Sequence, residues 1–148
     1  MHQHESVATI RPAILADLDT IKTLADANRA DIGFVLRPAL AASIARGWLY
    51  VAIRLDVLVG FVHFRVRRDG WTTIYEICTN ATVRRQGIGG TLLAAAYDAG
   101  VAQGQQGVQL KCPVGSSANL FYSAMGLCQI GEEAGKKRSL VLWQWKRQ

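Results

Sequence analysis

The stretch from Tyr75 to Leu93, YEICTNATVRRQGIGGTLL, constrains the fold of this chain more than any other segment. Residue types alternate from Tyr75 to Thr79, which indicates a strand with two chemically different faces. Polar residues and then three glycines follow, and the apolar, alanine-rich run after Thr91 predicts a helix. We therefore expect a strand, a glycine-rich turn and a helix start in direct succession.

The glycine-rich turn predicts an anion site. The first N–H groups of a helix are unpaired and lie at the positive end of its dipole, and Arg84 and Arg85 beside them favour a phosphate group. A Walker-type loop and a dinucleotide fingerprint do not fit, because Gly90 follows Gly89 and position 92 is leucine. The spacing that remains is R-x-x-G-x-G, from Arg84 to Gly89. For these six positions alone, a glycine turn that caps an ordinary helix is the alternative.

The composition is that of a soluble globular chain. It has 148 residues, of which 50% are hydrophobic and 19% charged, so we expect one domain that spans residues 1–148. No apolar run approaches the roughly twenty residues that cross a bilayer, and the first ten residues do not resemble a signal peptide. The three cysteines all lie in apolar contexts and predict reduced core thiols. We therefore expect a cytoplasmic protein with no membrane partner, and the spacing of the histidines predicts no metal site.

A formal net charge of +6 is compatible with two kinds of partner, nucleic acid or a small anionic ligand. The basic residues fall into short separate groups along the chain. Only Arg84 and Arg85 adjoin a loop that can hold an anion. The charge pattern therefore favours a phosphorylated cofactor over nucleic acid.

The remaining elements alternate between strands and helices, in the order β-α-α-β-β-β-α-β-α-β-β. This order predicts an α/β (α+β) fold, a mixed sheet with helices on both faces. His63 lies in the middle of a strand between aromatic neighbours and is interpreted as a satisfied sheet histidine. The expected ranges are strands at 7–11, 48–54, 57–67, 71–82, 108–112, 127–131 and 139–145, and helices at 14–28, 39–46, 90–103 and from Ser116 or Ser117 to Met125.

A second motif, ANLFYSAMGL from Ala118 to Leu127, lies downstream of the loop. Together with R-x-x-G-x-G it resembles the GNAT superfamily of N-acetyltransferases, in a bacterial branch without an agreed substrate. The order and the separation of the two motifs are also similar to those in this family. The resemblance covers nearly the whole chain and implies a central mixed, mostly antiparallel sheet flanked by helices. There are two departures from the pattern. Leu127 stands where phenylalanine is usual, and Gly115 stands where many members have asparagine.

The resemblance implies an acetyl-CoA-dependent enzyme that acetylates a primary amine of a small molecule, or a terminal amino group, by direct transfer without a metal. The pantetheine arm of the cofactor would pair with the backbone of the central strand, where the strands at 75–80 and 108–112 would splay. Its pyrophosphate would lie on the loop, with Arg84 mainly shaping it. The cofactor-binding residues implied are Ile77, Cys78, Thr79, Arg84, Arg85, Gln86, Gly87, Ile88, Gly89, Gly90, Thr91, Asn119, Phe121 and Tyr122.

Two side chains are the catalytic candidates that the resemblance implies. Glu76 is the carboxylate of the central strand and would act as the base for the amine, directly or through water. Its alternative is a sheet-edge carboxylate paired with an arginine. Tyr122 would donate a proton or hydrogen bond to the leaving thiolate, and its alternative is an aromatic core residue. Cys78 invites a covalent acyl-enzyme, which we do not favour because no histidine lies near it in sequence.

Other functions stay open at this level. The chain could be a catalytically silent CoA-binding module, or its acceptor could be a protein or an aminoacyl-tRNA. A general nucleic-acid binder would instead show steeply salt-dependent binding to random duplex. Four tryptophans and the apolar final strand LVLWQW are compatible with a homodimer.

Overall fold

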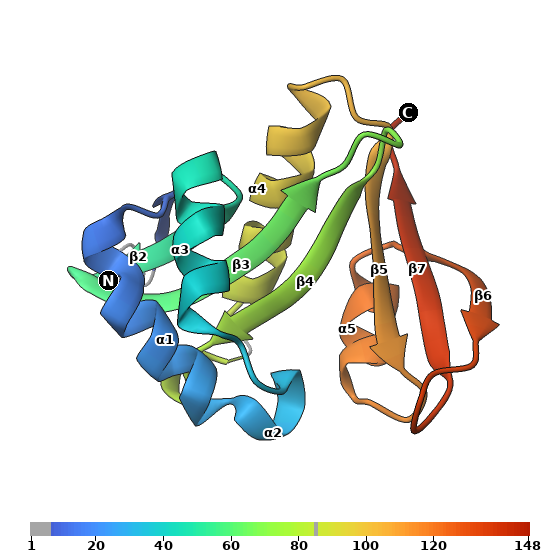
Figure 1. Ribbon diagram of the computed structural model, residues 1–148, viewed down its shortest axis with the longest axis horizontal. Coiled ribbons are helices and arrows are strands. Elements are labelled where there is room, and N and C mark those ends of the chain that lie inside the picture. The colour runs from blue at the N-terminus through green and yellow to red at the C-terminus, as the bar shows by residue number, and fades with distance from the viewer. Residues whose placement is uncertain (1–6, 85) are drawn as a thin grey trace. The chain divides into compact units, whose positions relative to one another are not determined.

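The computed structural model of the chain describes residues 7–84 and 86–148, and its seven strands form one mixed sheet flanked by helices (Figure 1). The strand order is β1-β2-β3-β4-β5-β7-β6. The pairs β1–β2, β2–β3, β5–β7 and β6–β7 are antiparallel, and β4–β5 is parallel. The strands are β1 (Thr9–Pro12), β2 (Leu49–Arg54), β3 (Val57–Val66), β4 (Thr72–Thr79), β5 (Gly107–Pro113), β6 (Cys128–Glu133) and β7 (Leu140–Lys146). The predicted mixed, mostly antiparallel fold is confirmed.

Four of the described helices were expected, with different ends, and α2 (Arg29–Ile32) is a short additional helix in a segment for which none was predicted. The helices are α1 (Leu18–Ala27), α2 (Arg29–Ile32), α3 (Arg37–Arg46), α4 (Ile88–Val101) and α5 (Ala118–Ala124), with short 3-10 turns at Leu15–Asp17 and Ala81–Val83. Helix α3 begins at Arg37, because Pro38 is compatible with a first helical turn. Helix α4 begins at Ile88, two residues before the predicted start. Ser117 stands at the N-cap of α5 without a capping bond, and Ser116 Oγ instead accepts a hydrogen bond from the Ala118 N–H.

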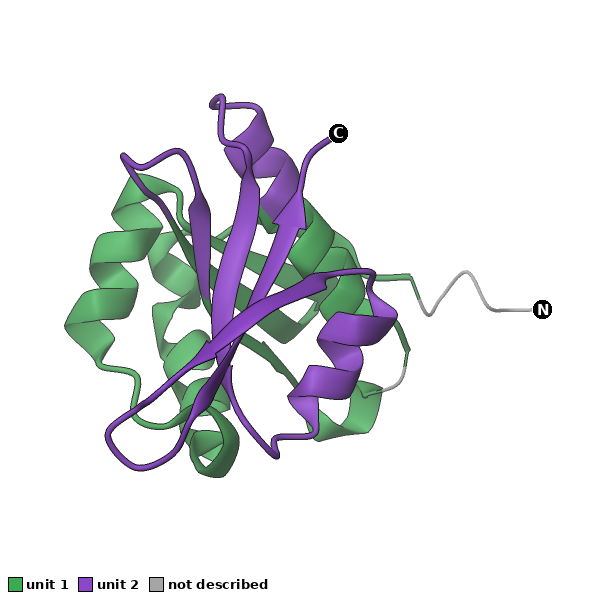
Figure 2. Ribbon diagram, turned by 90° about the vertical axis from the view of Figure 1, so that its right-hand side faces the viewer, with its two compact units in different colours: residues 1–65, 75–96 green, residues 66–74, 97–148 purple. Residues whose placement is uncertain are grey.

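The chain divides into two compact units, coloured separately in Figure 2. The first unit takes its described residues from 1–65 and 75–96, and the second from 66–74 and 97–148. Strand β4 contributes Thr72 to Ile74 to the second unit and Tyr75 to Thr79 to the first. The expectation of a single domain over residues 1–148 stays a prediction.

In the first unit, α1 and α3 pack on one face of the strands. Phe61 of β3 is fully buried in this core, together with residues of both helices and of β2. The preceding residue, Gly60, lies on the opposite face of β3. A Cβ at position 60 would come within 3.2 Å of Leu92 in α4. Neighbouring residues of a strand face opposite sides, so helices cover both faces here. The β2–β3 hairpin turns at Leu55 and Asp56, which both have positive φ, as the favoured two-residue hairpin turns require.

In the second unit, β5 pairs with β7 along its whole length. Gly107 allows the close approach of these strands, because a Cβ there would collide with the backbone oxygen of Trp145. Tyr97 of α4 stacks on Trp145 with ring centroids 4.7 Å apart. Strand β6 lies at the edge of the sheet and is mostly exposed.

Three further expectations can be compared with the described residues. None of their helices is long and apolar enough to cross a membrane. They also contain no group of three or more His, Cys, Asp or Glu side chains that could hold a metal ion. Cys78 and Cys112 are buried as predicted, but the prediction for Cys128 is wrong. Cys128 is exposed because it lies on the edge strand β6, which an apolar sequence context does not reveal.

Candidate active site

The loop between β4 and α4 is held by side chains from other parts of the first unit. Asn80 caps the 3-10 turn by accepting hydrogen bonds from the N–H and the hydroxyl of Thr82. Arg84 donates to the Oδ1 of Asn28, so its side chain braces the loop against the end of α1. Gln86 Oε1 accepts a 2.6 Å hydrogen bond from Arg54. The predicted cofactor residue Arg85 lies outside the described residues.

The start of α4 has the geometry of an anion site. Gly87 has a φ of +79°, a value that favours glycine, and Ile88 behind it is buried and anchors the first turn. The first intrahelical bond runs from the Thr91 N–H to the Gly87 carbonyl. The backbone N–H groups from Gly87 to Gly90 therefore have no intrahelical acceptor and can bind a phosphate group. Gly89 and Gly90 lie within this first turn rather than before it.

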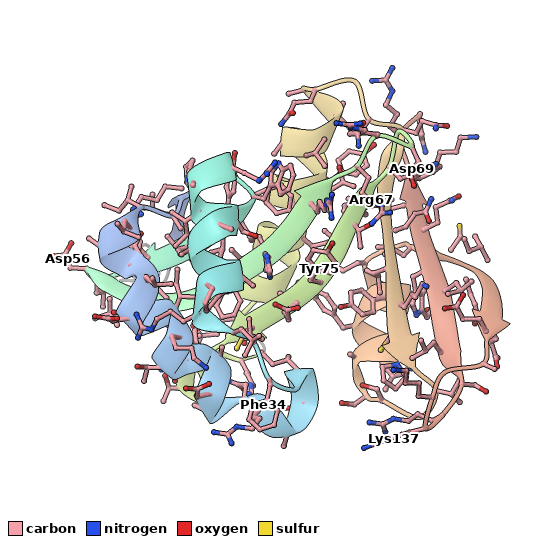
Figure 3. The ribbon with its side chains drawn as sticks, in the orientation of Figure 1. Phe34, Asp56, Arg67, Asp69, Tyr75 and Lys137 are labelled. Atoms are coloured by element: carbon pink, nitrogen blue, oxygen red, sulfur yellow. The ribbon has the colours of Figure 1, made fainter. Side chains whose placement is uncertain are left out.

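A cavity of about 520 Å³ opens in the first unit between α3 and the strands. Its size suits a small molecule or the end of a chain. Its polar lining consists of Ser43, Arg46, His63, Arg65 and Glu76. Its apolar lining includes Phe34, Leu36, Trp48 and Tyr75. Figure 3 labels Phe34 on the segment after α2 and Tyr75 on β4.

Ser43, His63 and Glu76 form a hydrogen-bonded chain in the wall of this cavity. Ser43 Oγ lies 2.7 Å from His63 Nε2, and His63 Nδ1 lies 2.9 Å from Glu76 Oε1. The His63 and Glu76 side chains are 8% and 16% exposed. With its hydrogen on Nδ1, the imidazole donates to the carboxylate and accepts from the Ser43 hydroxyl, so this tautomer satisfies all three groups. No described group of the first unit donates to the second oxygen of Glu76, which is available to a ligand.

The position of Ser43 follows from how α3 ends. Gly47 adopts a left-handed conformation, and the Trp48 N–H donates a 2.9 Å bond to the Ser43 carbonyl. This cap turns the chain directly into β2, whose Leu49 is the register partner of His63. The local sequence of α3 thus delivers Ser43 to His63. The sequence pattern did not single out Ser43, and the interpretation of His63 as a satisfied sheet histidine left out its connection to Glu76.

The alternative for Glu76 was an ion pair with an arginine, and its observed partner is instead His63. The strand pattern held a signal for this contact. Phe61 and His63 face the α1/α3 side of β3, and Cys78 and Glu76 face the same side of β4, because residues two apart share a face. A histidine and a glutamate at such positions are the polar exceptions on an otherwise apolar face. What the sequence did not show was which residues of β3 and β4 lie opposite each other.

Cys78 is a poor nucleophile in this environment. Burial raises the pKa of its thiol to about 12, with Arg84 opposing this shift and Glu76 adding to it. Its Sγ lies 3.7 Å from the Leu24 carbonyl, inside the core of the first unit. The thiol is therefore protonated at neutral pH, and a covalent acyl-enzyme at Cys78 is disfavoured. Ile77 and Thr79, the other expected pantetheine partners, lie beside it on β4.

The second unit holds the other three predicted residues on α5. Tyr122 is partly buried, with its ring centroid 5.2 Å from Phe121 and 6.3 Å from Trp143. Burial, and more weakly the nearby Cys112, raise the pKa of the Tyr122 phenol above its ordinary value. Asn119 donates to the carbonyls of Pro113 and Ser116 and accepts from Trp143 Nε1 at 2.8 Å. Its amide therefore holds α5 to β7, and its part in cofactor binding stays a prediction.

Each of the two units carries groups whose chemistry can be described by itself. The first unit has an anion site at α4 and a carboxylate that faces a cavity, and the second has a neutral phenol. A carboxylate that a buried histidine orients can accept a proton from a bound amine. A phenol whose pKa is raised stays protonated and can donate a hydrogen bond to a leaving anion.

Sequence comparison identifies one family. A family profile described as "Acetyltransferase (GNAT) domain" matches residues 45–126, which include β2, β3, β4, α4, β5 and the whole of α5. No curated protein matches the chain in sequence.

Comparison with solved structures shows the same fold at low sequence identity. Ard1 from Thermoplasma volcanium is 16% identical, with a TM-score of 0.82 over 95% of this chain and 97% of that one. The ribosomal-protein-S18-alanine N-acetyltransferase from Escherichia coli is 15% identical, with a TM-score of 0.76 over 95% and 94%. The structure of yncA from Salmonella typhimurium with its cofactor acetyl-CoA is 17% identical, with a TM-score of 0.78 over 94% and 93%.

Proposed function

The chain belongs to the GNAT acetyltransferase family, and we propose that it transfers an acetyl group from acetyl-CoA to a primary amine by direct transfer. The amine belongs to a small molecule or is a terminal amino group. One observation carries the proposal: Glu76 faces a cavity of about 520 Å³ with a hydrogen-bonded histidine and serine behind it. The similar fold of yncA with its bound acetyl-CoA supports the choice of acyl donor.

The residues at the start of α4 fit the pyrophosphate of acetyl-CoA. The N–H groups from Gly87 to Gly90 would bind its oxygens, and the described Arg84 would hold the loop in place through Asn28. We also assign binding of the cofactor to the remaining loop residues, which are Arg85, Gln86 and Thr91. The backbone of Ile77 to Thr79 would pair with the pantetheine arm, because the pairing of β4 with β5 covers only Thr72 and Thr73 before it.

Glu76 is the base in this proposal. Acetyl-CoA supplies the acetyl group as a thioester, which only a neutral amine attacks. The Glu76 oxygen that is free of His63 accepts the proton of the ammonium group directly. The His63 N–H holds the other oxygen at 2.9 Å and so orients the carboxylate toward the cavity.

Ser43 provides a second path for the same proton. Its oxygen can accept a hydrogen from the ammonium group while its own hydrogen passes to His63 Nε2, which lies 2.7 Å away. His63 then releases its Nδ1 hydrogen to Glu76, so the proton ends on the carboxylate and no charge stays on the imidazole. The chain of three residues thus acts as a proton relay.

Tyr122 assists the departure of the CoA thiolate. Its raised pKa keeps the phenol protonated at neutral pH, so it can donate a hydrogen bond or proton to the sulfur. We place Phe121 and Asn119 of the same helix next to the cofactor.

Titration calorimetry with acetyl-CoA, combined with a thiol-release assay over an amine panel, tests the proposal. We expect binding of acetyl-CoA and amine-dependent release of CoA thiol, together with an acetylated amine in the mass spectrum. Binding without thiol release on any amine would instead identify a silent CoA-binding module. Absence of acetyl-CoA binding would remove α4 from its assigned role.

A further inference from the structure

Two arginines line the cavity that Glu76 also lines. The guanidinium groups of Arg46 and Arg65 lie over the Trp48 ring, 5.1 Å and 5.8 Å from its centroid. Arg46 is the last residue of α3, and Arg65 is close to the end of β3. Both side chains line the cavity, as does the tryptophan between them.

Neither arginine has an ion-pair partner among the described residues of its own unit. The ion pairs among the described residues of the first unit are Arg11–Asp17, Lys22–Asp26, Arg37–Asp19 and His63–Glu76. Contact with the face of one tryptophan ring stabilises the positive charge of an arginine only weakly. The cavity wall therefore carries two uncompensated positive charges and the single carboxylate of Glu76.

This charge balance selects among amines. An amine with no other charge is a cation before it reaches the base, and two arginines repel it as strongly as they attract an anion. A polyamine would meet the same repulsion several times over. On the basis of the proposed function, we propose that the acetyl acceptor is an amine that also carries a carboxylate or a phosphate, which Arg46 and Arg65 bind.

The positions of the arginines indicate how far this anion lies from the amine. Arg46 follows Ser43 by three residues on α3, and Arg65 follows His63 by two residues on β3, so the backbone positions of the arginines are displaced by about 5–7 Å from those of Ser43 and His63. The acceptor class is an amine joined to its acidic group through an intervening body.

The intervening body is apolar or aromatic. Phe34, Leu36 and Tyr75 line the same cavity and are 76%, 66% and 44% exposed. Exposed apolar side chains around a concave site are typical of ligand binding. They leave a surface on which a ring or a short hydrocarbon chain can pack between the two charged ends.

The matched probes for this inference are 4-(aminomethyl)benzoate and its methyl ester, which share the amine and the ring and differ in the negative charge and one methyl group. We expect the full-length protein to acetylate the carboxylate with a kcat/KM on the order of tenfold or more above that of the ester. The phosphonate analogue should share the preference of the carboxylate. Equal or better acetylation of the ester would overturn the proposal.

Substitutions test whether the arginines cause the preference. The double variant Arg46→Gln/Arg65→Gln should reduce the ratio of kcat/KM for the carboxylate to kcat/KM for the ester to about one. Arg37→Gln is the matched control, because it removes an arginine from the same helix outside the cavity and should keep the wild-type ratio. A preference that persists in the double variant would assign the selectivity to other groups and contradict the proposal.

A binding measurement keeps this test independent of turnover. Calorimetric titration of the two probes into the wild type and the double variant should show the same charge preference whether or not acetyl transfer occurs. Equal affinity for both probes in the wild type overturns the acceptor class. Failure of the proposed function has a different signature, because acetyl-CoA binding or thiol release is then missing while the preference for the carboxylate is retained.

Discussion

The loop from Asn80 to Thr91 and the cavity wall at Ser43, His63 and Glu76 are built in different ways. The loop acts through backbone N–H groups that follow one another in sequence, and Gly87 gives the turn its positive φ. The cavity wall acts through three side chains that are twenty and thirteen residues apart and meet only in the folded unit.

This difference predicts how each region responds to substitution. The loop tolerates changes of side chain that leave its backbone accessible, but a new side chain that occupies the anion position removes binding. The cavity wall keeps its shape when one polar group is replaced by an isostere, while the proton path is interrupted. Substitutions in the loop should therefore affect cofactor affinity, and substitutions in the wall should affect turnover.

Gly89→Glu should have the largest effect. The new carboxylate would lie in the first turn of α4, where it repels and displaces the pyrophosphate. We expect the affinity for acetyl-CoA to fall below detection in calorimetry. Ala102→Glu, which places the same carboxylate on an exposed position after the other end of α4, is the control and should bind as the wild type does. Circular dichroism must show that Gly89→Glu is folded, and wild-type affinity in a folded variant would remove the loop from cofactor binding.

Glu76→Gln should lower turnover at neutral pH by about 10²–10⁴-fold, the range for loss of a general base. Glutamine keeps the size of the side chain and an oxygen that can accept from His63 Nδ1. The melting temperature should therefore change little, and affinity for acetyl-CoA should be retained. A lowered melting temperature with unchanged turnover would show instead that the contact with His63 is purely structural.

Tyr122→Phe should reduce turnover by about ten- to a thousandfold through loss of the phenol hydrogen. The ring still fills its place beside Phe121 and Trp143, so affinity for acetyl-CoA should stay within a few-fold.

The raised pKa of Tyr122 has a further consequence for the wild type. Its phenol stays protonated through pH 10, so ionisation of Tyr122 should produce no alkaline fall in rate below that pH. Wild-type turnover in the phenylalanine variant would return Tyr122 to a packing role.

Ser43→Ala should have the smallest effect, a reduction in turnover of about two- to tenfold. The direct path from the amine to Glu76 remains, and only the relay through His63 is lost. Ser123→Ala, which removes an exposed hydroxyl from α5, is the matched control. Unchanged turnover in Ser43→Ala would show that the proton reaches Glu76 without the serine.

The elements and the loop could be predicted because their signals are local. The glycine at position 87, the apolar run after Thr91 and the turn at Leu55 and Asp56 each act within a few residues. The helix starts were less accurate, because Pro38 and Gly89 are compatible with the first turn of a helix as well as with the loop before it. Local pattern does not distinguish these cases.

The cavity wall could not be predicted because its contacts depend on register and packing. Glu76 was identified as the carboxylate of the central strand and as a candidate base, but the alternative considered for it was pairing with an arginine and not with His63. Only the packing of α3 on β3, which the cap at Gly47 determines, brings Ser43 to His63. The two arginines over Trp48 depend on the same packing and were likewise not identified as a pair.

The kcat/KM for 4-(aminomethyl)benzoate at neutral pH, measured with wild type and Glu76→Gln together with their affinity for acetyl-CoA, tests the assignment of the base most directly. We predict a lower kcat/KM in the variant at unchanged affinity for acetyl-CoA. The same kcat/KM in both proteins would contradict the assignment, because the amine would then reach the thioester without help from Glu76.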